Sequence, residues 1–362
     1  MVKICTSEGL TFDDVLLLPR KATVAREKVD LTTTLHPRIT LKLPILSSPM
    51  DTVTEGSMAI AIAEAGGLGV LHRNLTIEKQ AGLVKDVKKK KLIAAAAIGA
   101  GTDMEQRVKA LVNVGVDMIV VDSGHGHSDF IMDAVRFIKK NHGKKVVIMA
   151  GNIATYEGAK DLIKAGADIL RVGVGPGSIC TTRIVTGMGV PQVTALMEVA
   201  RAVRGSKVTF IADGGIRQMG DIAKALATGA SAVMLGSMLA GYEESAGETV
   251  TIDGKKFKQY RGMGSVSAMQ RGGAERYGQS MKTDAKKLIP EGVEGVVPLK
   301  GSVGDFLYQA AGSLRSAFYY VGSKNLREFH KNAEFIRITE ASLKESHPHT
   351  IAITDAGGNY CL

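Results

Sequence analysis

The sequence contains little cysteine: its 362 residues include only Cys5, Cys180 and Cys361. Three thiols so far apart, and odd in number, suit a reducing compartment better than a framework of disulfides. None of them has a partner at the spacing that metal-binding cysteines require. We therefore expect a cytoplasmic protein without structural disulfides or a cysteine-bound zinc ion.

Long hydrophobic runs are also missing. The apolar stretch 92–100 is far shorter than the ~20 residues that cross a bilayer. The N-terminus lacks the basic segment and apolar core of a signal peptide. Hydrophobic residues nevertheless make up 45% of the chain, which is enough for one large α/β barrel or two ordinary domains. We expect a soluble protein that does not enter a membrane.

The formal net charge is +10, yet the charges are mostly scattered along the chain. A basic balance is compatible with nucleic acid, anionic membranes or small anionic substrates, and it does not choose among them. The densest run, residues 88–91, closes a helical pattern, where cations complement the helix dipole. No nucleic-acid recognition motif accompanies the charge, so the sequence argues against nucleic acid as the partner.

Short apolar strands alternate with amphipathic helices along most of the chain. The segments VKALVNVGVDMIVVDSG, AKDLIKAGADILRVGVG and AKALATGASAVMLGS repeat one pattern of helix, glycine and strand. Gly115, Gly166 and Gly229 stand where a helix end needs a residue that tolerates positive φ. Apolar runs and periodicity predict strands over 45–50, 68–71, 92–98, 146–150 and 208–212, with helices over 54–65 and about 77–90.

About eight strand–helix units fit in the chain, which is the number that closes a parallel barrel. We therefore predict an α/β fold, a (β/α)8 TIM barrel that forms a single domain over residues 1–362. A doubly wound open sheet stays an alternative because periodicity cannot show closure, although length and even spacing favour the barrel. Two regions break the pattern. Residues from about 243 to 300 predict a long flap insertion near the last strand–helix unit, and the polar tail after His347 is either frayed or docked on a neighbouring subunit.

In barrels of this type the active site lies in the loops that follow the strands. The seventh and eighth of these loops are rich in glycine and serine, and Gly214, Gly215, Gly236 and Ser237 can offer N–H groups and a hydroxyl to a phosphate. Asp213 beside them suits a ribose, because a carboxylate accepts hydrogen bonds from two hydroxyls. The alternative is that these glycines only make tight turns.

Cys180 lies in the sixth loop, GVGPGSICTTR, between Gly177 and Arg183. A thiol on a glycine-rich loop is well placed to attack a ligand, and nearby N–H groups together with Arg183 favour the thiolate. A single cysteine is also often a small buried apolar residue, so both roles stay open on these residues alone. His125 and His127 in DSGHGHS are weak metal candidates without a third ligand, and lining of a cofactor site is the better interpretation.

The loop GVGPGSICTTR and the following TGMGVPQ closely resemble the catalytic loop of the family of inosine-5′-monophosphate (IMP) dehydrogenases and guanosine-5′-monophosphate (GMP) reductases. The resemblance covers nearly the whole chain, through LTFDDVLLLP, SSPMDTVTE, HRNLTIEKQ, ADGGI, YRGMGS and SHPH in the right order. Several long motifs in order are far more specific than one short glycine pattern. The resemblance implies a (β/α)8 barrel assembled as a homotetramer.

For a dehydrogenase, the resemblance implies that Cys180 attacks C2 of the hypoxanthine ring of IMP and that hydride leaves to NAD. The covalent thioimidate is then hydrolysed to xanthosine 5′-monophosphate, the committed step of guanine nucleotide biosynthesis. Thr182 would assist proton transfer, and in the flap motif ERYGQ Arg276 would activate water while Tyr277 orients it. Physical chemistry alone favours a histidine or a carboxylate as that base, because the ordinary pKa of arginine exceeds ~12.

The resemblance also implies the binding residues. IMP would contact Ser48, Met50, Ser178, Asp213, Gly214, Gly215, Gly236, Ser237, Tyr260, Gly262, Met263, Gly264 and Glu291. NAD would lie across Asp122, Ser123, Gly173 and Gly175. A monovalent cation, usually potassium (K+), would bind carbonyls of Gly175, Gly177 and Cys180, and a neighbouring subunit would complete its shell with carbonyls around Glu345, Ser346 and His347.

One departure from the family is a missing segment. Typical members carry a pair of cystathionine-β-synthase-type regulatory modules between the second helix and the third strand. Here VKDVKKKKLIAAAAIG runs straight across, with the junction at about 88–92. The barrel elements are complete, so we expect the chemistry to be intact without regulation through that module.

Three alternatives to a dehydrogenase stay open. They are a GMP reductase with the same cysteine loop, a non-catalytic nucleotide- or nucleic-acid-binding protein, and a flavin-dependent barrel oxidoreductase. The Arg276–Tyr277 pair and PEGVEG at 290–295 favour the dehydrogenase, because a reductase needs no hydrolytic flap.

Overall fold

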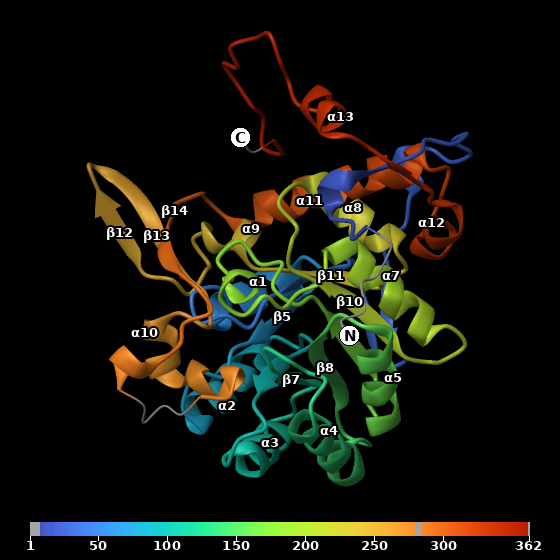
Figure 1. Ribbon diagram of the computed structural model, residues 1–362. Helices are drawn as coiled ribbons and strands as arrows, with labels where there is room; N and C mark the ends of the chain where they lie inside the picture. The colour runs from blue at the N-terminus through green and yellow to red at the C-terminus, as the bar shows by residue number, and fades with distance from the viewer. Residues whose placement is uncertain (1–7, 280–283, 361–362) are drawn as a thin grey trace, which may run out of the picture.

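The computed structural model describes residues 8–279 and 284–360, so Cys5 and Cys361 lie outside the described residues. Eight parallel strands pair side by side and close into a barrel, in the order β10–β11–β4–β5–β6–β7–β8–β9 (Figure 1). The closed barrel confirms the predicted TIM barrel and excludes the open sheet. Its strands are β4 (Ile45–Ser47), β5 (Leu68–Leu71), β6 (Ala95–Ile98), β7 (Met118–Asp122), β8 (Val147–Ile153), β9 (Ile169–Val172), β10 (Thr209–Asp213) and β11 (Ala232–Leu235).

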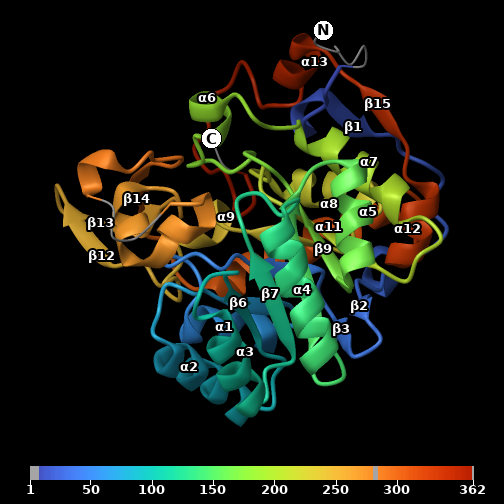
Figure 2. The same ribbon diagram turned by 60° about the horizontal axis from the view of Figure 1, so that its bottom comes forward.

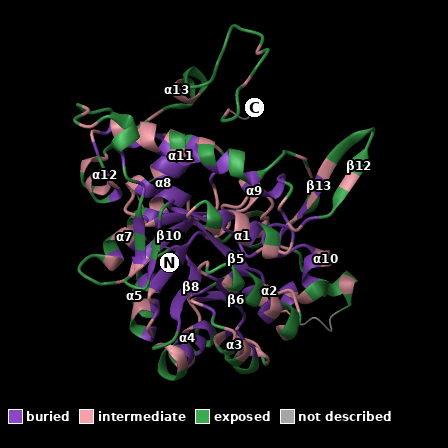
Figure 3. Cartoon of the chain, turned by 180° about the vertical axis from the view of Figure 1, so that it is seen from behind, coloured by how far each residue is buried: buried purple, intermediate pink, exposed green. Residues whose placement is uncertain are grey.

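Helices surround the barrel, with their outer faces exposed and the strands buried at the centre (Figure 3). Gly115, Gly166 and Gly229 have φ of +82°, +108° and +103° at helix ends, as predicted. No helix among residues 8–279 and 284–360 is long and apolar enough to cross a membrane. The covering helices are α1 (Gly56–Glu64), α2 (Ile77–Lys89), α3 (Met104–Asn113), α4 (Asp129–His142), α5 (Tyr156–Ala165), α7 (Gln192–Val203), α8 (Met219–Ala227) and α11 (Val303–Tyr320).

Two hydrophobic layers hold the barrel together. Neighbouring residues of a strand point to opposite sides, so Ile45 packs in the layer under the helices and Leu46 in the layer inside the barrel. The hairpin of β2 (Thr33–His36) and β3 (Ile39–Leu41) adds Leu35 to the inner layer. Hydrogen bonds tie this hairpin to the chain at the starts of β10 and β11. The amino ends of the strands are therefore closed, and the carboxyl ends are left for a site.

Two strand boundaries differ from the prediction and affect the site. β4 ends at Ser47 rather than at residue 50, so Ser48 and Met50 lie in the loop that follows it. β8 continues beyond residue 150 to Ile153 and carries the buried Asn152 through a register shift. A run of apolar residues cannot predict that a strand continues through a buried glycine and asparagine, because the run ends before them.

The predicted flap insertion follows the last barrel strand and projects from the barrel (Figure 2). It contains a three-stranded antiparallel sheet that we did not predict, made of β12 (Thr249–Ile252), β13 (Lys255–Arg261) and β14 (Glu294–Pro298). Most residues of β12 and β14 are exposed, so these strands lack the alternation by which a half-buried strand is recognised. Short helical segments connect β13 to β14: α10 (Val266–Ala268), η3 (Met269–Gly273), η4 (Ala274–Tyr277) and η5 (Ala285–Lys287).

The segments near the two chain ends pair with each other, β1 (Val15–Leu17) antiparallel to β15 (Phe335–Arg337). Beyond α12 (Leu326–Asn332) and α13 (Glu340–Glu345) the polar tail is mostly exposed and extends away from the barrel (Figure 1). It returns to its own barrel near Gly358, where an added Cβ would stand 3.7 Å from the Gln309 side chain of α11.

The junction at 88–92 is short in the structure. Helix α2 ends at Lys89, Lys91 adopts a φ of +60°, and β6 begins at Ala95. Lys88 lies 2.7 Å from Asp117, and Lys89, Lys90 and Lys91 are exposed. The basic run is therefore a solvated helix end, as predicted.

Candidate active site

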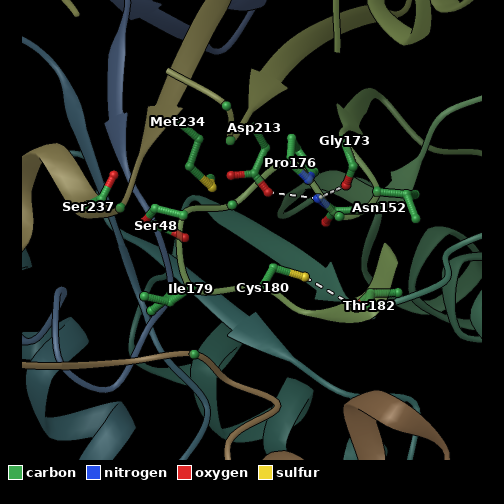
Figure 4. Close-up of a pocket in the computed structure, with 18 of the residues that line it drawn as sticks. Ser48, Asn152, Gly173, Pro176, Ile179, Cys180, Thr182, Asp213, Met234 and Ser237 are labelled. Carbon is green, nitrogen blue, oxygen red and sulfur yellow. Dashed lines mark hydrogen bonds between the residues drawn. The ribbon is translucent and has the colours of Figure 1, made fainter. Parts of the chain in front are cut away.

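A cavity of about 450 Å³ opens at the carboxyl ends of the barrel strands. The loops after β4, β9, β10 and β11 form most of its wall, and the insertion supplies the rest. Figure 4 shows Cys180 in the loop after β9, Asp213 at the end of β10 and Ser237 shortly after β11 around the same space. The structure brings together the predicted residues Ser48, Met50, Gly173, Gly175, Gly177, Ser178, Cys180, Thr182, Asp213, Gly214, Gly215, Gly236, Ser237, Tyr260, Gly262, Met263, Arg276, Tyr277 and Glu291.

The other predicted site residues do not line this cavity: Asp122, Ser123, Gly264, Glu345, Ser346 and His347. The first two are buried at the carboxyl end of β7. Gly264 lies in the insertion and packs against Tyr277 of the same insertion, because an added Cβ would stand 2.8 Å from the Tyr277 ring. The last three are exposed in the C-terminal segment.

The cysteine loop is tied down on both sides of the thiol. The N–H of Cys180 donates to the Gly177 carbonyl at 3.1 Å, and the next N–H, of Thr181, donates to the Glu291 carbonyl at 2.9 Å. The sulfur of Cys180 lies 3.2 Å from the Thr182 hydroxyl (Figure 4). Cys180 is half-buried rather than fully buried. The thiol is therefore held beside a hydroxyl at the cavity wall, which excludes its alternative role as a core residue.

The Arg183 side chain stabilises the cysteine loop by hydrogen bonds to backbone carbonyls of that loop. Its guanidinium donates to the carbonyls of Val174 at 3.3 Å and Val190 at 2.6 Å, which closes both ends of the loop. The side chain fits against two glycines, since a Cβ at Gly175 or at Gly189 would stand 2.6 Å from its Cγ. Arg183 thus donates its hydrogen bonds to the loop backbone and not to the thiol. The expectation that Arg183 favours the thiolate rests on its positive charge alone.

One end of the cavity is lined by hydroxyls and glycine. The phenol of Tyr260 shares hydrogen bonds with Ser178 and Ser237, and burial raises its pKa to about 12. At Gly236 an added Cβ would stand 3.4 Å from this phenol oxygen. Neutral donors around a glycine backbone suit a phosphate, which they bind without the cost of burying a second charge.

The wall also carries a carboxylate, of which one oxygen is engaged in hydrogen bonds. Oδ2 of Asp213 accepts hydrogen bonds from Asn152 Nδ2 at 2.7 Å and from Arg171 Nε at 2.8 Å (Figure 4). No residue in the described part of the chain donates to Oδ1. Asp213 therefore offers an acceptor to a ligand hydroxyl while its other oxygen is fixed.

Arg171 joins this carboxylate to a second one. Its Nη1 also pairs with Asp122, and all three side chains are largely shielded from water. Sequence reasoning assigned no role to Arg171, Asn152 or Gln192, which all line the cavity. A charged residue inside the apolar strand ADILRVGVG was the signal that marked Arg171, since a buried cation needs buried anions.

Replacing Arg171 by methionine should lower the free energy of unfolding by about 3 kcal/mol, because two buried carboxylates would lose their shared cation. Denaturant unfolding would measure this loss. Arg136 of α4 is the matched control, since its pair with Asp133 is exposed and an exposed pair contributes below about 1 kcal/mol. Equal stability of the Arg171 variant and the native protein would contradict the assigned role.

The insertion places its motif ERYGQ over β7. The guanidinium of Arg276 pairs with the carboxylate of Asp122, and the Arg276 carbonyl accepts a hydrogen bond from the N–H of Gly124 at 3.1 Å. Burial lowers the pKa of Arg276, against an opposing influence of Tyr277, and burial also raises the pKa of Tyr277. The flap is thus closed in this structure, with its arginine on a carboxylate that we predicted to bind NAD.

The histidines of DSGHGHS follow the residues that we predicted to bind NAD, and the N–H of His125 donates to the Ser123 hydroxyl at 3.1 Å, so their interpretation as lining of a cofactor site stays a prediction. Neither His125 nor His127 is among the residues that line the cavity. His127 instead lies 2.9 Å from Asp161 at the surface.

The sequence matches the family described as IMP dehydrogenase / GMP reductase domain over residues 9–349. The inosine-5′-monophosphate dehydrogenase of Borreliella burgdorferi is 43% identical, over 96% of this chain and 98% of that protein. The enzyme of the same name from Aquifex aeolicus is 41% identical over 98% of each chain, and that from Bacillus subtilis is 38% identical over 99% of each. The chain therefore belongs to the IMP dehydrogenase / GMP reductase family.

Proposed function

We propose that this protein oxidises IMP to xanthosine 5′-monophosphate, with NAD as hydride acceptor and water as the source of the new oxygen. The observation that carries the proposal is Cys180, held beside Thr182 in a cavity that also presents a phosphate-sized set of donors and the free oxygen of Asp213. Relatives named inosine-5′-monophosphate dehydrogenase, at 38–43% identity over nearly the full length, support it.

The cavity suggests how the nucleotide is oriented. The phosphate would accept hydrogen bonds from Tyr260, Ser178 and Ser237, and the ribose hydroxyls would donate to Asp213. The base would then extend toward Cys180, with Met50 and Met263 on its faces and Glu291 at its N1 edge. Gly214, Gly215, Gly236 and Gly262 complete the expected contacts through their backbones.

The first half of the reaction is an attack by sulfur. The Cys180 thiolate would form a bond to C2 of the hypoxanthine ring, and the C2 hydrogen would leave as hydride with its electron pair. NAD supplies the acceptor for that hydride. Thr182, whose hydroxyl lies 3.2 Å from the sulfur, would relay the proton that the thiol loses.

The second half is hydrolysis. Water would attack C2 of the thioimidate, the C–S bond would break, and the thiolate would be restored as xanthosine 5′-monophosphate leaves. Arg276 would take the proton from water while Tyr277 orients it. Burial lowers the pKa of Arg276, which brings an arginine closer to the range in which it can act as a base.

The residues expected to hold NAD fit a group with hydroxyls. Oδ2 of Asp122 is buried and has no hydrogen-bond partner in the described part of the chain, which suits a ribose hydroxyl. Ser123, Gly173 and Gly175 would add a hydroxyl and backbone groups. Because Arg276 pairs with the same carboxylate, the flap and NAD would occupy this place in turn.

The donor set expected for the monovalent cation also fits. Backbone carbonyls are neutral hard oxygens, the ligands that suit K+. Within residues 8–279 and 284–360, no group donates a hydrogen bond to the carbonyl of Gly175 or Cys180, whereas that of Gly177 accepts one from Cys180. Carbonyls around Glu345, Ser346 and His347 of a second subunit would complete the shell, which requires an oligomer, and we propose the homotetramer that the resemblance implies. Light scattering would test that assembly.

We propose that the chain is the catalytic domain alone and acts in the cytoplasm. The alignment with the Aquifex aeolicus enzyme runs over 482 positions, which is more than the 362 residues of this chain. The link from Lys89 to Ala95 is the point at which we expect the additional positions, because the missing regulatory module would lie there.

The second candidate is a GMP reductase, which shares the family and the cysteine loop. The closed flap with Arg276 in the cavity favours the dehydrogenase, because only hydrolysis needs a positioned water. Two assays in potassium buffer, read by nicotinamide absorbance, decide between them. A rise with IMP and NAD alone is the expected result, a fall with GMP and NADPH alone would mean a reductase, and silence in both would favour a binding protein.

A further inference from the structure

An ion pair outside the catalytic residues fastens the closed flap to the barrel. Oε2 of Glu275, in η4, lies 3.7 Å from Nη1 of Arg73, which follows β5. The Arg73 side chain is only 8% exposed, while that of Glu275 is 41% exposed. Nε of Arg73 also lies 3.9 Å from Oδ2 of Asp122. Arg73 therefore stands between a barrel carboxylate and a flap carboxylate.

The barrel is shaped to admit this pair. A Cβ at Gly101 would stand 2.4 Å from Oε2 of Glu275, and a Cβ at Gly99 would stand 2.4 Å from Nη1 of Arg73. A side chain at either position would displace the end of one of the two charged side chains from its place in the pair. The two glycines therefore leave the room in which the Glu275 carboxylate and the Arg73 guanidinium meet.

A second approach joins the same loop to the flap. Gly272 of η3 has a φ of +123°, and an added Cβ would stand 3.3 Å from Oδ1 of Asn74. That oxygen is buried without a hydrogen-bond partner in the described part of the chain. The adjacent residues Arg73 and Asn74 therefore both face the closed flap.

We propose that Arg73 is a positioning residue that latches the flap through Glu275 and so sets the balance between the closed and the open flap. The inference rests on the proposed function, in which the closed flap serves hydrolysis and the open flap admits NAD. Neither residue touches the reacting atoms. The latch acts on Arg276, which immediately follows Glu275 and shares the Asp122 site with NAD.

The charges around Arg73 explain why the latch favours the closed flap. Burial lowers the pKa of Arg73, and Glu275 is the strongest influence that opposes this shift. When the flap opens, the buried guanidinium loses that partner, so opening is disfavoured. Because Glu275 is partly exposed, water screens the pair, and we expect its loss to change the closed-to-open ratio about two- to fivefold. The Arg276–Asp122 pair still holds the flap, so the latch tunes the balance.

The first test needs no catalysis. Hydrogen exchange of the flap amides at 269–279 would be followed in the ligand-free protein. Glu275→Gln and Arg73→Met should each speed this exchange about two- to fivefold. The double variant should be no faster than either alone, because both changes break one contact. Arg73→Lys should restore most of the protection, and Glu78→Gln, an exposed carboxylate of α2 without an ion pair in the described structure, should change nothing.

The second test separates the two half-reactions. In Glu275→Gln the burst of NADH from the first turnover should keep its rate, hydrolysis of the covalent adduct should slow about two- to fivefold, and inhibition by excess NAD should strengthen by a similar factor. A change in stability alone would not move these quantities in opposite directions.

Either test can overturn the proposal. If the flap amides of Glu275→Gln exchange at the native rate, or if the effects of the two single changes on the exchange rate add, the pair does not hold the flap. A native rate of flap exchange in Arg73→Met would likewise show that Arg73 does not hold the flap. Absence of any NADH formation from IMP and NAD in the native protein would instead refute the proposed function, and the exchange measurements would still decide the latch.

Discussion

Replacing Cys180 by alanine is expected to reduce turnover roughly 10⁵-fold or more, because the attack on C2 has no other nucleophile. The sulfur lies at the cavity wall beside Thr182, and the Cys180 loop is held by hydrogen bonds of its own backbone and of Glu291. Alanine keeps those backbone bonds. The site should therefore keep its shape and lose only the reacting atom.

Binding should survive the same substitution. The phosphate donors around Tyr260 and the free oxygen of Asp213 do not depend on the thiol, so the Kd for IMP, measured by calorimetry, should change no more than a few-fold. Cys361→Ala is the matched control and should leave turnover unchanged. A normal steady-state rate of NADH formation in the Cys180 variant would remove the covalent mechanism, and loss of IMP binding with loss of turnover would point to a structural role.

The barrel could be predicted from the sequence because each strand–helix unit carries its own local signal. Gly166 illustrates this. A glycine between a helical pattern and an apolar run predicts a helix end with positive φ, without any knowledge of distant contacts, and the φ of Gly166 is +108°. The loop residues of the site, such as Gly214 and Ser237, could be predicted because they directly follow such strands. The register of the units then brings them together in space.

The charge network could not be predicted in the same way. Asp122, Arg171 and Asp213 are far apart in the chain, on β7, β9 and β10, and each is recognisable as a partner only when the closed barrel brings these strands together. Asn152 was missed because β8 continues past its apolar run. The antiparallel sheet of the insertion was missed because its strands expose most of their residues, so burial left no pattern in them.

The flap is the feature for which sequence and structure needed each other. Physical chemistry favours a histidine or a carboxylate over Arg276 as a base, and only the resemblance to the family pointed to it. The structure supplies a reason that spacing alone does not contain. Arg276 is buried against Asp122, and burial lowers its pKa from a value at which an arginine is useless as a base.

Replacing Arg276 by alanine is expected to spare hydride transfer and to slow hydrolysis about 10²- to 10³-fold, the usual contribution of a general base. The guanidinium is not needed for the attack by Cys180, and its removal frees the Asp122 carboxylate for NAD. The covalent adduct should therefore accumulate. Rapid mixing would show a burst of one NADH per site followed by a slow phase, and intact-mass spectrometry would detect the adduct on the protein. Arg271→Ala, an exposed arginine of η3, is the matched control.

The pH dependence of hydrolysis should distinguish a base from a merely structural arginine. Burial lowers the pKa of Arg276, and only the neutral guanidine can accept a proton from water. Below that pKa, each unit of rising pH increases the neutral fraction tenfold, so the hydrolysis rate of the native protein should rise with pH. In the alanine variant this rise should flatten, while the rate of the NADH burst keeps its own profile. A variant that hydrolyses slowly but retains the native slope would assign Arg276 to holding the flap closed and would leave the base to another residue.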